Sequence, residues 1–209
     1  MAQDREQADP EAPIVAFDFD GTLTVRDSYT AFLKWRTPRW KWILGGLRLI
    51  PAAVAYLFHR DRGRIKAAAT KVFLLGASRE QLEAEARAFA GEHSRSLLRP
   101  DAVIAWKRWR KERVRLVIVT ASPDVVVAPF ARGLGAHHIL GTPLAYDERG
   151  RVTGAFASPN CRGAEKVARL KAAFGPDLHI RAAYGDTSGD TEMLAIAEEP
   201  YFRVFSGRA

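Results

Sequence analysis

An apolar, β-prone run at residues 14–19 (IVAFDF) leads into a turn. Similar runs occur at 114–119 and 179–184, and each is followed by small or polar residues typical of a turn. Runs of this length bounded by turn residues are typical of buried strands. A short fourth candidate strand lies at 202–205, and helical patterns fill the intervals at residues 99–112, 123–132, 164–174 and 191–198. Strands that alternate with helices predict an α/β fold, in which helices cover both faces of a parallel sheet.

Residues 28–98 interrupt this alternation, because they contain helical patterns and no convincing strand. Ser78 and Gln81 form a capping-box pattern, which predicts the start of a polar helix over residues 78–90. We interpret residues 28–98 as a helical cap domain inserted after the first strand.

The rest of the chain is then expected to form one core domain. A flexible leader occupies residues 1–13, and two segments, 14–27 and 99–209, form the core. Within the core, a turn at 147–150 lies between two β-prone runs and predicts a hairpin over 139–156.

Acidic side chains follow the first and third predicted strands. Asp18 lies near the end of the first run and Asp20 directly after it, and Asp186 and Asp190 come after the third run. Because ligands bind at the carboxyl ends of parallel strands, we expect these carboxylates to form one site. Carboxylates at the end of an apolar strand are costly unless a group binds them, and their oxygens suit Mg²⁺. One carboxylate can attack phosphorus while another transfers protons.

Groups that can hold a phosphate follow the second predicted strand and begin a later helix. Thr120, Ala121 and Ser122 offer hydroxyl and backbone N–H groups. Lys166 adds a fixed positive charge near a helix start, and the helix dipole reinforces it. Hydrolysis of a phosphate monoester requires a nucleophile, a proton donor and groups that neutralise a dianion, so these strand ends predict a phosphatase site.

The same residues resemble a known family. The sequences DFDGT, IVTAS, AEKVARL and GDTSGD match, in order, the four motifs of the haloacid dehalogenase-like superfamily. The resemblance implies a Rossmann-like core with an inserted α-helical cap of the C1 type, and hydrolysis of phosphate monoesters with Mg²⁺. The implied roles are nucleophile for Asp18, general acid and base for Asp20, phosphoryl binding for Thr120 and Lys166, and metal binding for Asp18, Asp186, Asp190 and the backbone carbonyl of Asp20.

Longer stretches resemble one branch of the superfamily, the phosphoserine phosphatase-like subfamily IB. DGTLTVRDSYTAFLKW, NCRGAEKVARL and GDTSGDTEMLAIAEEP are similar to its phosphatidylglycerophosphatase C-like members. This implies a lipid phosphate, such as phosphatidylglycerophosphate, as substrate. The chain departs from the phosphoserine enzymes because it has no obvious Glu after DGT to bind the serine amine, although Asp27 can substitute as a substrate-binding residue. A soluble phosphatase for a small metabolite is the alternative.

A basic charge excess and one apolar segment raise the question of a membrane. The formal net charge is +8, which attracts anions in general. Residues 40–60 are apolar, with Arg48 and Pro51 inside and with aromatic and basic residues at both ends, a layout that suits a bilayer interface. Shallow peripheral contact with an anionic membrane is one interpretation. The other is a pair of cap helices that meet at Pro51 and bury their apolar faces together.

The remaining features limit the partners and the compartment. We interpret the basic cluster at 107–111 as the exposed face of a core helix, so no nucleic-acid partner is expected. The N-terminus lacks the layout of a signal peptide, and Cys161 is the one cysteine, so no internal disulfide can form. We therefore expect a cytoplasmic enzyme, peripheral on the inner face of the membrane if residues 40–60 bind lipid. A non-catalytic basic binding protein is the alternative from another class.

Overall fold

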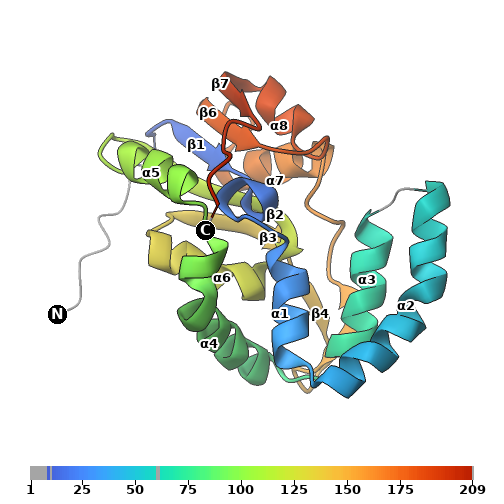
Figure 1. Cartoon of the computed structure of the whole chain (residues 1–209). Helices are drawn as coiled ribbons and strands as arrows, with labels where there is room; N and C mark the ends of the chain where they lie inside the picture. Colours follow the sequence, from blue (N-terminus) through green and yellow to red (C-terminus); the bar gives the residue numbers. More distant parts are fainter. Residues whose placement is uncertain (1–8, 10, 60–61, 209) are drawn as a thin grey trace.

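The computed structural model describes residues 9, 11–59 and 62–208, and a five-stranded sheet lies at its centre (Figure 1). The strand order is β3-β2-β1-β6-β7, and each pair of neighbours is parallel. The predicted α/β fold is therefore confirmed, and the three long predicted strands are the three central ones. The strands are β1 (Ile14–Phe17), β2 (Arg115–Pro123), β3 (His138–Thr142), β6 (Ile180–Gly185) and β7 (Ala197–Phe202).

The sheet is buried on both faces because alternate side chains of its strands enter two separate apolar clusters. In β1, Val15 and Phe17 belong to the first cluster, whereas Ile14 and Ala16 belong to the second. The absence of a polar position in β1 agrees with the continuous apolar runs that parallel strands require.

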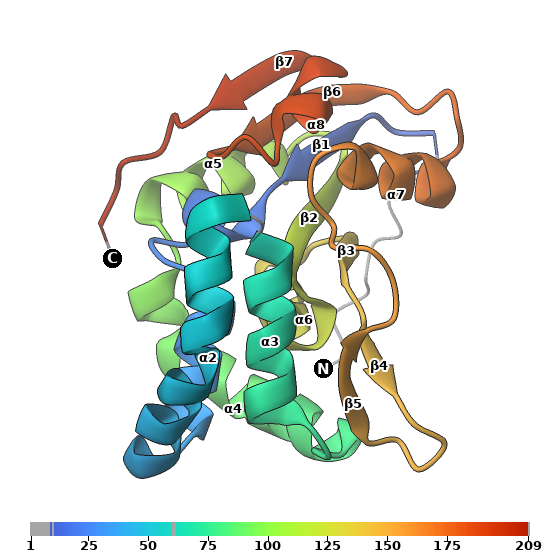
Figure 2. The same ribbon diagram turned by 90° about the vertical axis from the view of Figure 1, so that its right-hand side faces the viewer.

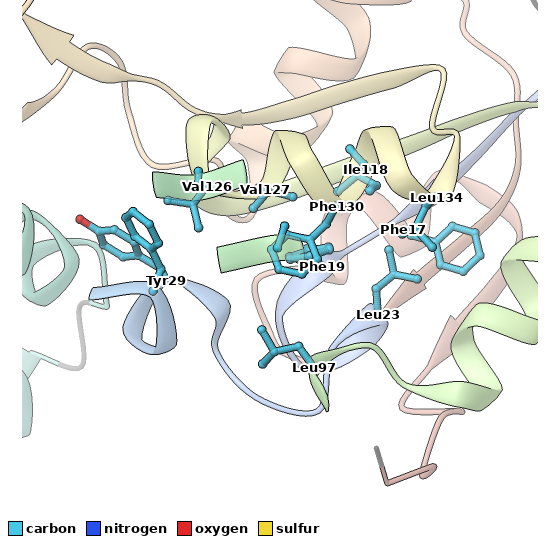
Figure 3. Packing of buried hydrophobic residues seen from close by; sticks show 14 of the residues in the cluster. Phe17, Phe19, Leu23, Tyr29, Leu97, Ile118, Val126, Val127, Phe130 and Leu134 are labelled. Atoms are coloured by element: carbon cyan, nitrogen blue, oxygen red, sulfur yellow. The ribbon is translucent and has the colours of Figure 1, made fainter. Parts of the chain in front are cut away.

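Four helices cover these two faces. The first cluster receives side chains from α5 (Pro100–Trp109) and α6 (Asp124–Leu134), and the second from α7 (Ala164–Phe174) and α8 (Thr191–Ala195). Figure 3 shows the first cluster, where Phe19 lies beside Phe130 with ring centroids 5.5 Å apart. This packing fixes the turn that follows β1, and the candidate site begins at that turn.

The C-terminal part of the sheet differs from the prediction. The helix expected at 191–198 begins at Thr191 as predicted but ends at Ala195, so its predicted end was wrong. The strand expected at 202–205 lies instead at Ala197–Phe202, so that prediction was wrong as well. Pro200 indicated a helix end, but it lies within β7. Proline is tolerated there because β7 is an edge strand of the sheet.

The region expected to form one hairpin is divided between two sheets. β4 (Leu144–Tyr146) and β5 (Val152–Phe156) pair antiparallel across the turn at 147–150, so the hairpin is confirmed there. Residues 138–142 form β3 instead, which pairs with β2 at the other edge of the main sheet. Pro143 lies between β3 and β4, where the chain leaves the main sheet.

The described residues between 28 and 97 form four helices, which we call the helical insert: α1 (Ser28–Arg36), α2 (Arg39–His59), α3 (Arg62–Leu74) and α4 (Arg79–Leu97). The predicted cap of α4 is present, since the Ser78 hydroxyl accepts the N–H of Gln81 at 3.1 Å. The helix is longer than the predicted 78–90. Whether the insert acts as a separate cap domain on a core of 14–27 and 99–209 stays a prediction.

The helices of the insert differ in how they contact the sheet layer. α4 packs against both α1 and α6 through Phe89, whose ring lies 5.5 Å from that of Phe32 on α1 and 6.0 Å from that of Phe130 on α6. α2 and α3 lie side by side, with α2 on the outer side (Figures 1 and 2).

The segment 40–60 forms most of α2, apart from Arg60, which lies outside the described residues, as do residues 1–8 and 10 of the predicted leader. α2 continues through Pro51, so the interpretation as two helices that meet at Pro51 was wrong. The carbonyl of Leu47, which loses its helical donor to Pro51, belongs to an exposed residue and can bond water. In the part of the chain that the structure describes, no helix is both long and apolar enough to cross a bilayer.

Candidate active site

A pocket of about 240 Å³ opens at the carboxyl ends of β1, β2 and β6, the edge where parallel sheets bind ligands. Each of the predicted site residues except Ser122 lines it, together with residues that no motif reasoning selected. The lining residues are Asp18, Asp20, Gly21, Asp27, Lys66, Thr120, Ala121, Asn160, Arg162, Lys166, Asp186, Thr187, Gly189 and Asp190.

Asp18 directly follows β1 and is bonded to the buried ammonium of Lys166. Lys166 lies in the first turn of α7, and all three N–H groups of its ammonium donate hydrogen bonds. Its Nζ donates to Asp18 Oδ1 at 2.6 Å, to Asp190 Oδ1 at 2.6 Å and to the carbonyl of Val119 at 2.7 Å. Three donors and three acceptors fix the ammonium between the ends of three strands.

Burial shifts the pKa values of this network in opposite directions. It raises the pKa of Asp18 to about 7, although the Lys166 ammonium acts against the shift. Burial alone would lower the pKa of Lys166, but the carboxylates of Asp18 and Asp190 outweigh it and raise that pKa. Burial also opposes ionisation of Asp190, yet Lys166 holds its pKa below the usual range. Lys166 and Asp190 therefore stay charged, and Asp18 is the member of the network whose negative charge is least compensated.

The loop after β6 adds Asp186 and completes an acidic trio. Asp190 folds this loop by accepting the N–H of Thr187 at 2.9 Å and the N–H of Asp186 at 3.2 Å. Asp18, Asp186 and Asp190 each offer a carboxylate oxygen, and these three oxygens lie within 4.8 Å of one another. Mg²⁺ takes oxygen ligands of this kind and would offset charge that Lys166 neutralises only in part. The donor set therefore fits Mg²⁺.

Asp20 lies two residues after Asp18, yet its carboxylate has different partners. A regular strand would aim both side chains to one side, but β1 ends at Phe17. Asp20 Oδ1 accepts the N–H of Ser28 at 2.7 Å, and Oδ2 is hydrogen-bonded to the Ser122 hydroxyl. Burial, and then the nearby Asp27 carboxylate, raises the pKa of Asp20. A carboxyl group of this kind, outside the acidic trio, is suited to proton transfer.

The residues after the second predicted strand divide between two tasks. Thr120 and Ala121 line the pocket, and the Thr120 hydroxyl accepts the N–H of Ser122 at 3.1 Å. Ser122 is fully buried, and its hydroxyl is bonded to Asp20 and accepts from Lys66 Nζ at 3.0 Å. Ser122 therefore holds two side chains of the site in place.

Lys66 is the main site residue that the sequence analysis missed. It lies near the start of α3 in the helical insert and forms an ion pair with Asp27 at 3.2 Å. Asp27 also caps α1 by accepting the N–H of Thr30 at 2.7 Å. Burial opposes ionisation of Asp27, but the positive charge of Lys66 and the hydrogen bond from Thr30 outweigh burial and lower the pKa of Asp27. No motif marks Lys66, because its place depends on how α3 packs against the strand ends.

Gly21→Ala is expected to destabilise the fold by about 1–3 kcal/mol. Gly21 has a φ of +87°, and an added Cβ would lie 2.4 Å from Asp186 Oδ2, so the substitution strains the turn and displaces an acidic side chain. Urea denaturation measures the effect. Gly91→Ala is the matched control, because Gly91 lies within α4 with no atom within 4 Å of an added Cβ. It should stabilise by about 0.5–1 kcal/mol. Wild-type stability of Gly21→Ala would contradict this account of the turn.

Comparisons with known proteins agree with the geometry. The family model described as haloacid dehalogenase-like hydrolase matches residues 15–195. Protein CicA of Caulobacter vibrioides is 59% identical over 199 residues, which cover 95% of this chain and 89% of that protein. A probable phosphatase of Mycobacterium tuberculosis is 27% identical over 88% of this chain and 67% of its own length.

A solved structure of a phosphoserine phosphatase with a phospho-aspartyl intermediate analogue shares the fold. Its TM-score is 0.55 with 16% identity, and the match covers 90% of this chain and 84% of that one. Because the family model spans most of the chain and CicA is similar along nearly all of it, the chain belongs to the haloacid dehalogenase-like hydrolases, as the motifs predicted.

Proposed function

We propose that this hydrolase is a Mg²⁺-dependent phosphatase that cleaves phosphate monoesters through a phosphorylated Asp18. The observation that carries the proposal is the place of Asp18, which lines the pocket, is bonded to Lys166 and belongs to the acidic trio. Two comparisons support it. The mycobacterial relative is named a probable phosphatase, and the phosphoserine phosphatase of the same fold contains an analogue of a phospho-aspartyl intermediate.

The two carboxyl groups of the loop after β1 have separate roles in this proposal. Lys166 occupies Oδ1 of Asp18, and we assign the attack on phosphorus to the other oxygen. As the new oxygen–phosphorus bond forms, the ester bond breaks and Asp20 gives its proton to the leaving oxygen. A water molecule then attacks the phosphoryl group, Asp20 accepts its proton, and phosphate leaves as Asp18 is regenerated.

Other residues bind the ion and the phosphoryl group. The carboxylates of Asp18, Asp186 and Asp190 would hold Mg²⁺, together with the backbone carbonyl of Asp20. When bound, the ion would supply positive charge that offsets the repulsion between the phosphate oxygens and the carboxylates of the site. We assign the phosphoryl oxygens to the Thr120 hydroxyl and the N–H group of Ala121, with the Lys166 ammonium as the positive charge beside them. The N–H of Ser122 donates to the Thr120 hydroxyl instead. The Ser122 hydroxyl holds Asp20 in place.

Removal of divalent metal is expected to lower the release of phosphate from an aryl phosphate by at least ~10²-fold. The acidic trio without its cation repels the phosphate dianion and lacks the charge that orders it. A colorimetric rate assay with chelator, followed by excess Mg²⁺, measures the loss and its recovery. Chelator already saturated with Mg²⁺ is the control. An undiminished rate in metal-free chelator would exclude the metal from the mechanism.

The favoured substrate is a lipid phosphate such as phosphatidylglycerophosphate, as in the subfamily IB members that the motifs resemble, with the helical insert as the cap. The Asp27–Lys66 pair supports this choice over an amino-acid phosphate. A substrate amine would compete with Lys66 for a carboxylate that also caps α1. Rates with phosphatidylglycerophosphate and with phosphoserine, each in the presence of Mg²⁺, distinguish the two classes.

A soluble phosphatase for a small metabolite is the second candidate. It is favoured by the pocket of about 240 Å³, because most of the residues that line it are polar or charged. Faster turnover of water-soluble esters than of any lipid phosphate would select it. Absence of turnover across a broad panel of esters with Mg²⁺ would instead support a non-catalytic basic binding protein.

A further inference from the structure

The outer face of α2 carries large apolar side chains that nothing in the described chain covers. Six of them are exposed, by between 48% and 64%, and we call this set the α2 stripe: Trp40, Ile43, Leu44, Leu47, Ile50 and Val54. The rest of the described chain exposes five large apolar side chains, far apart in the sequence except near the C-terminus: Leu75, Ile104, Ile196, Phe202 and Val204. Scattered apolar residues on a surface are common, but contiguous patches mark interaction sites.

The helical repeat explains why these six residues form one stripe. Their spacings of three and four residues place them on one side of the helix. The opposite side is anchored on α3, since Trp42 stacks on Phe73 with ring centroids 4.8 Å apart. An added Cβ at Gly45 would lie 2.3 Å from the ring of Phe73, so the two helices are in close contact there. α2 lies on the outer side of α3 (Figures 1 and 2), and the exposure of the six side chains places the stripe on the side of α2 that α3 does not cover.

The charges that α2 itself carries beside the stripe are all positive. α2 contains Arg39, Lys41 and Arg48, each exposed, and no Asp or Glu occurs anywhere between residues 28 and 60. Lys41 and Arg48 also line a surface pocket of about 510 Å³, together with Trp40 and Leu44 of the stripe. Glu85 of α4 also lines this pocket, where it forms an ion pair with Arg36 at 2.8 Å. Apolar side chains beside three exposed cations, with no acidic residue on α2 itself, match the interface of an anionic lipid layer. A second copy of this chain would bring like charge against like charge.

We propose that the α2 stripe docks this protein onto an anionic lipid surface, with its apolar side chains in the interface and Arg39, Lys41 and Arg48 among the headgroups. α2 is joined to α3 by two residues, and Lys66 near the start of α3 lines the pocket. Docking along α2 would therefore bring the pocket close to the lipid layer. Docking does not require the phosphatase reaction. A failure of docking and a failure of the proposed function are therefore separate results.

Cosedimentation of the full chain with vesicles tests the docking. The vesicles contain phosphatidylcholine alone or phosphatidylcholine with about one-third phosphatidylglycerol. The wild type is expected to bind the anionic vesicles at least ~10-fold more tightly, and binding should weaken as salt is raised. The double variant Ile43→Gln/Leu47→Gln should weaken this binding about tenfold or more. The matched control is Ile104→Gln, since Ile104 is 68% exposed on α5, and it should bind as the wild type does.

Three outcomes would overturn the proposal. They are no binding of the wild type to anionic vesicles, equal binding of the wild type and the double variant, and equal losses in the double variant and Ile104→Gln. Sedimentation velocity without lipid detects the rival occupant, because a dimer that the double variant dissociates would assign the stripe to a second copy. Circular dichroism and the rate with an aryl phosphate verify the fold of each variant, since Ile43 and Leu47 lie outside the candidate active site.

Discussion

Replacement of Asp18 by Asn is expected to lower kcat for an aryl phosphate by about 10⁴-fold or more in saturating Mg²⁺. The amide has nearly the shape of the carboxylate, but it is a poor nucleophile and cannot form the acyl phosphate. Lys166 keeps its bonds to Asp190 and to the carbonyl of Val119, so the pocket retains the group that orders it. Steady-state kinetics of the purified variant measures the loss.

Stability measurements distinguish this loss from unfolding. Burial raises the pKa of Asp18 to about 7, above its usual range. A carboxyl group whose pKa is raised by folding favours the folded state at low pH and opposes it above that pKa. At pH 8 without metal, Asp18→Asn should therefore be at least as stable as the wild type. Asp177→Asn is the matched control, because Asp177 is exposed, and it should keep the wild-type rate. A rate for Asp18→Asn above about one-tenth of wild type would exclude Asp18 as the nucleophile.

The sequence predicted the fold correctly where the hydrophobic pattern of a segment reflects its burial in the sheet. β1 is apolar along its whole length, and β2 and β6 are mostly apolar, because both faces of the sheet are covered, and this property shows directly in the residue types. Polar residues at the ends of such strands are confined to one edge by parallel topology. The location of the pocket could therefore be inferred without any knowledge of side-chain contacts.

The parts that the sequence could not predict depend on long-range packing. β3 and β7 are edge strands with partly exposed side chains, so they lack the apolar signature of the central strands. Pro200 then indicated a helix end at a position that an edge strand also tolerates. Lys66 reaches the site from helix α3, and its position cannot be predicted from the residues next to it in the sequence. The same is true of Trp40 and Trp42, which face opposite sides of α2.

Lys166→Met is expected to destabilise the protein by about 3–5 kcal/mol and to lower kcat by about 10³-fold. Methionine fills most of the volume of lysine but carries no charge. The change leaves the carboxylates of Asp18 and Asp190 buried together, without the ammonium that lies 2.6 Å from each. The carbonyl of Val119 loses a donor as well. Urea denaturation in chelator measures the stability, and steady-state kinetics in saturating Mg²⁺ measures the rate.

The same substitution elsewhere on α7 isolates the effect of the buried charge. Lys171→Met is the matched control, because Lys171 is exposed in the same helix, and it should change stability by less than about 0.5 kcal/mol and leave the rate unchanged. Mg²⁺ should recover part of the stability lost in Lys166→Met, because a cation held by the acidic trio restores positive charge beside Asp18 and Asp190. Equal stabilities of the two variants in chelator would contradict the role of Lys166, because the carboxylates would then tolerate each other without a buried cation.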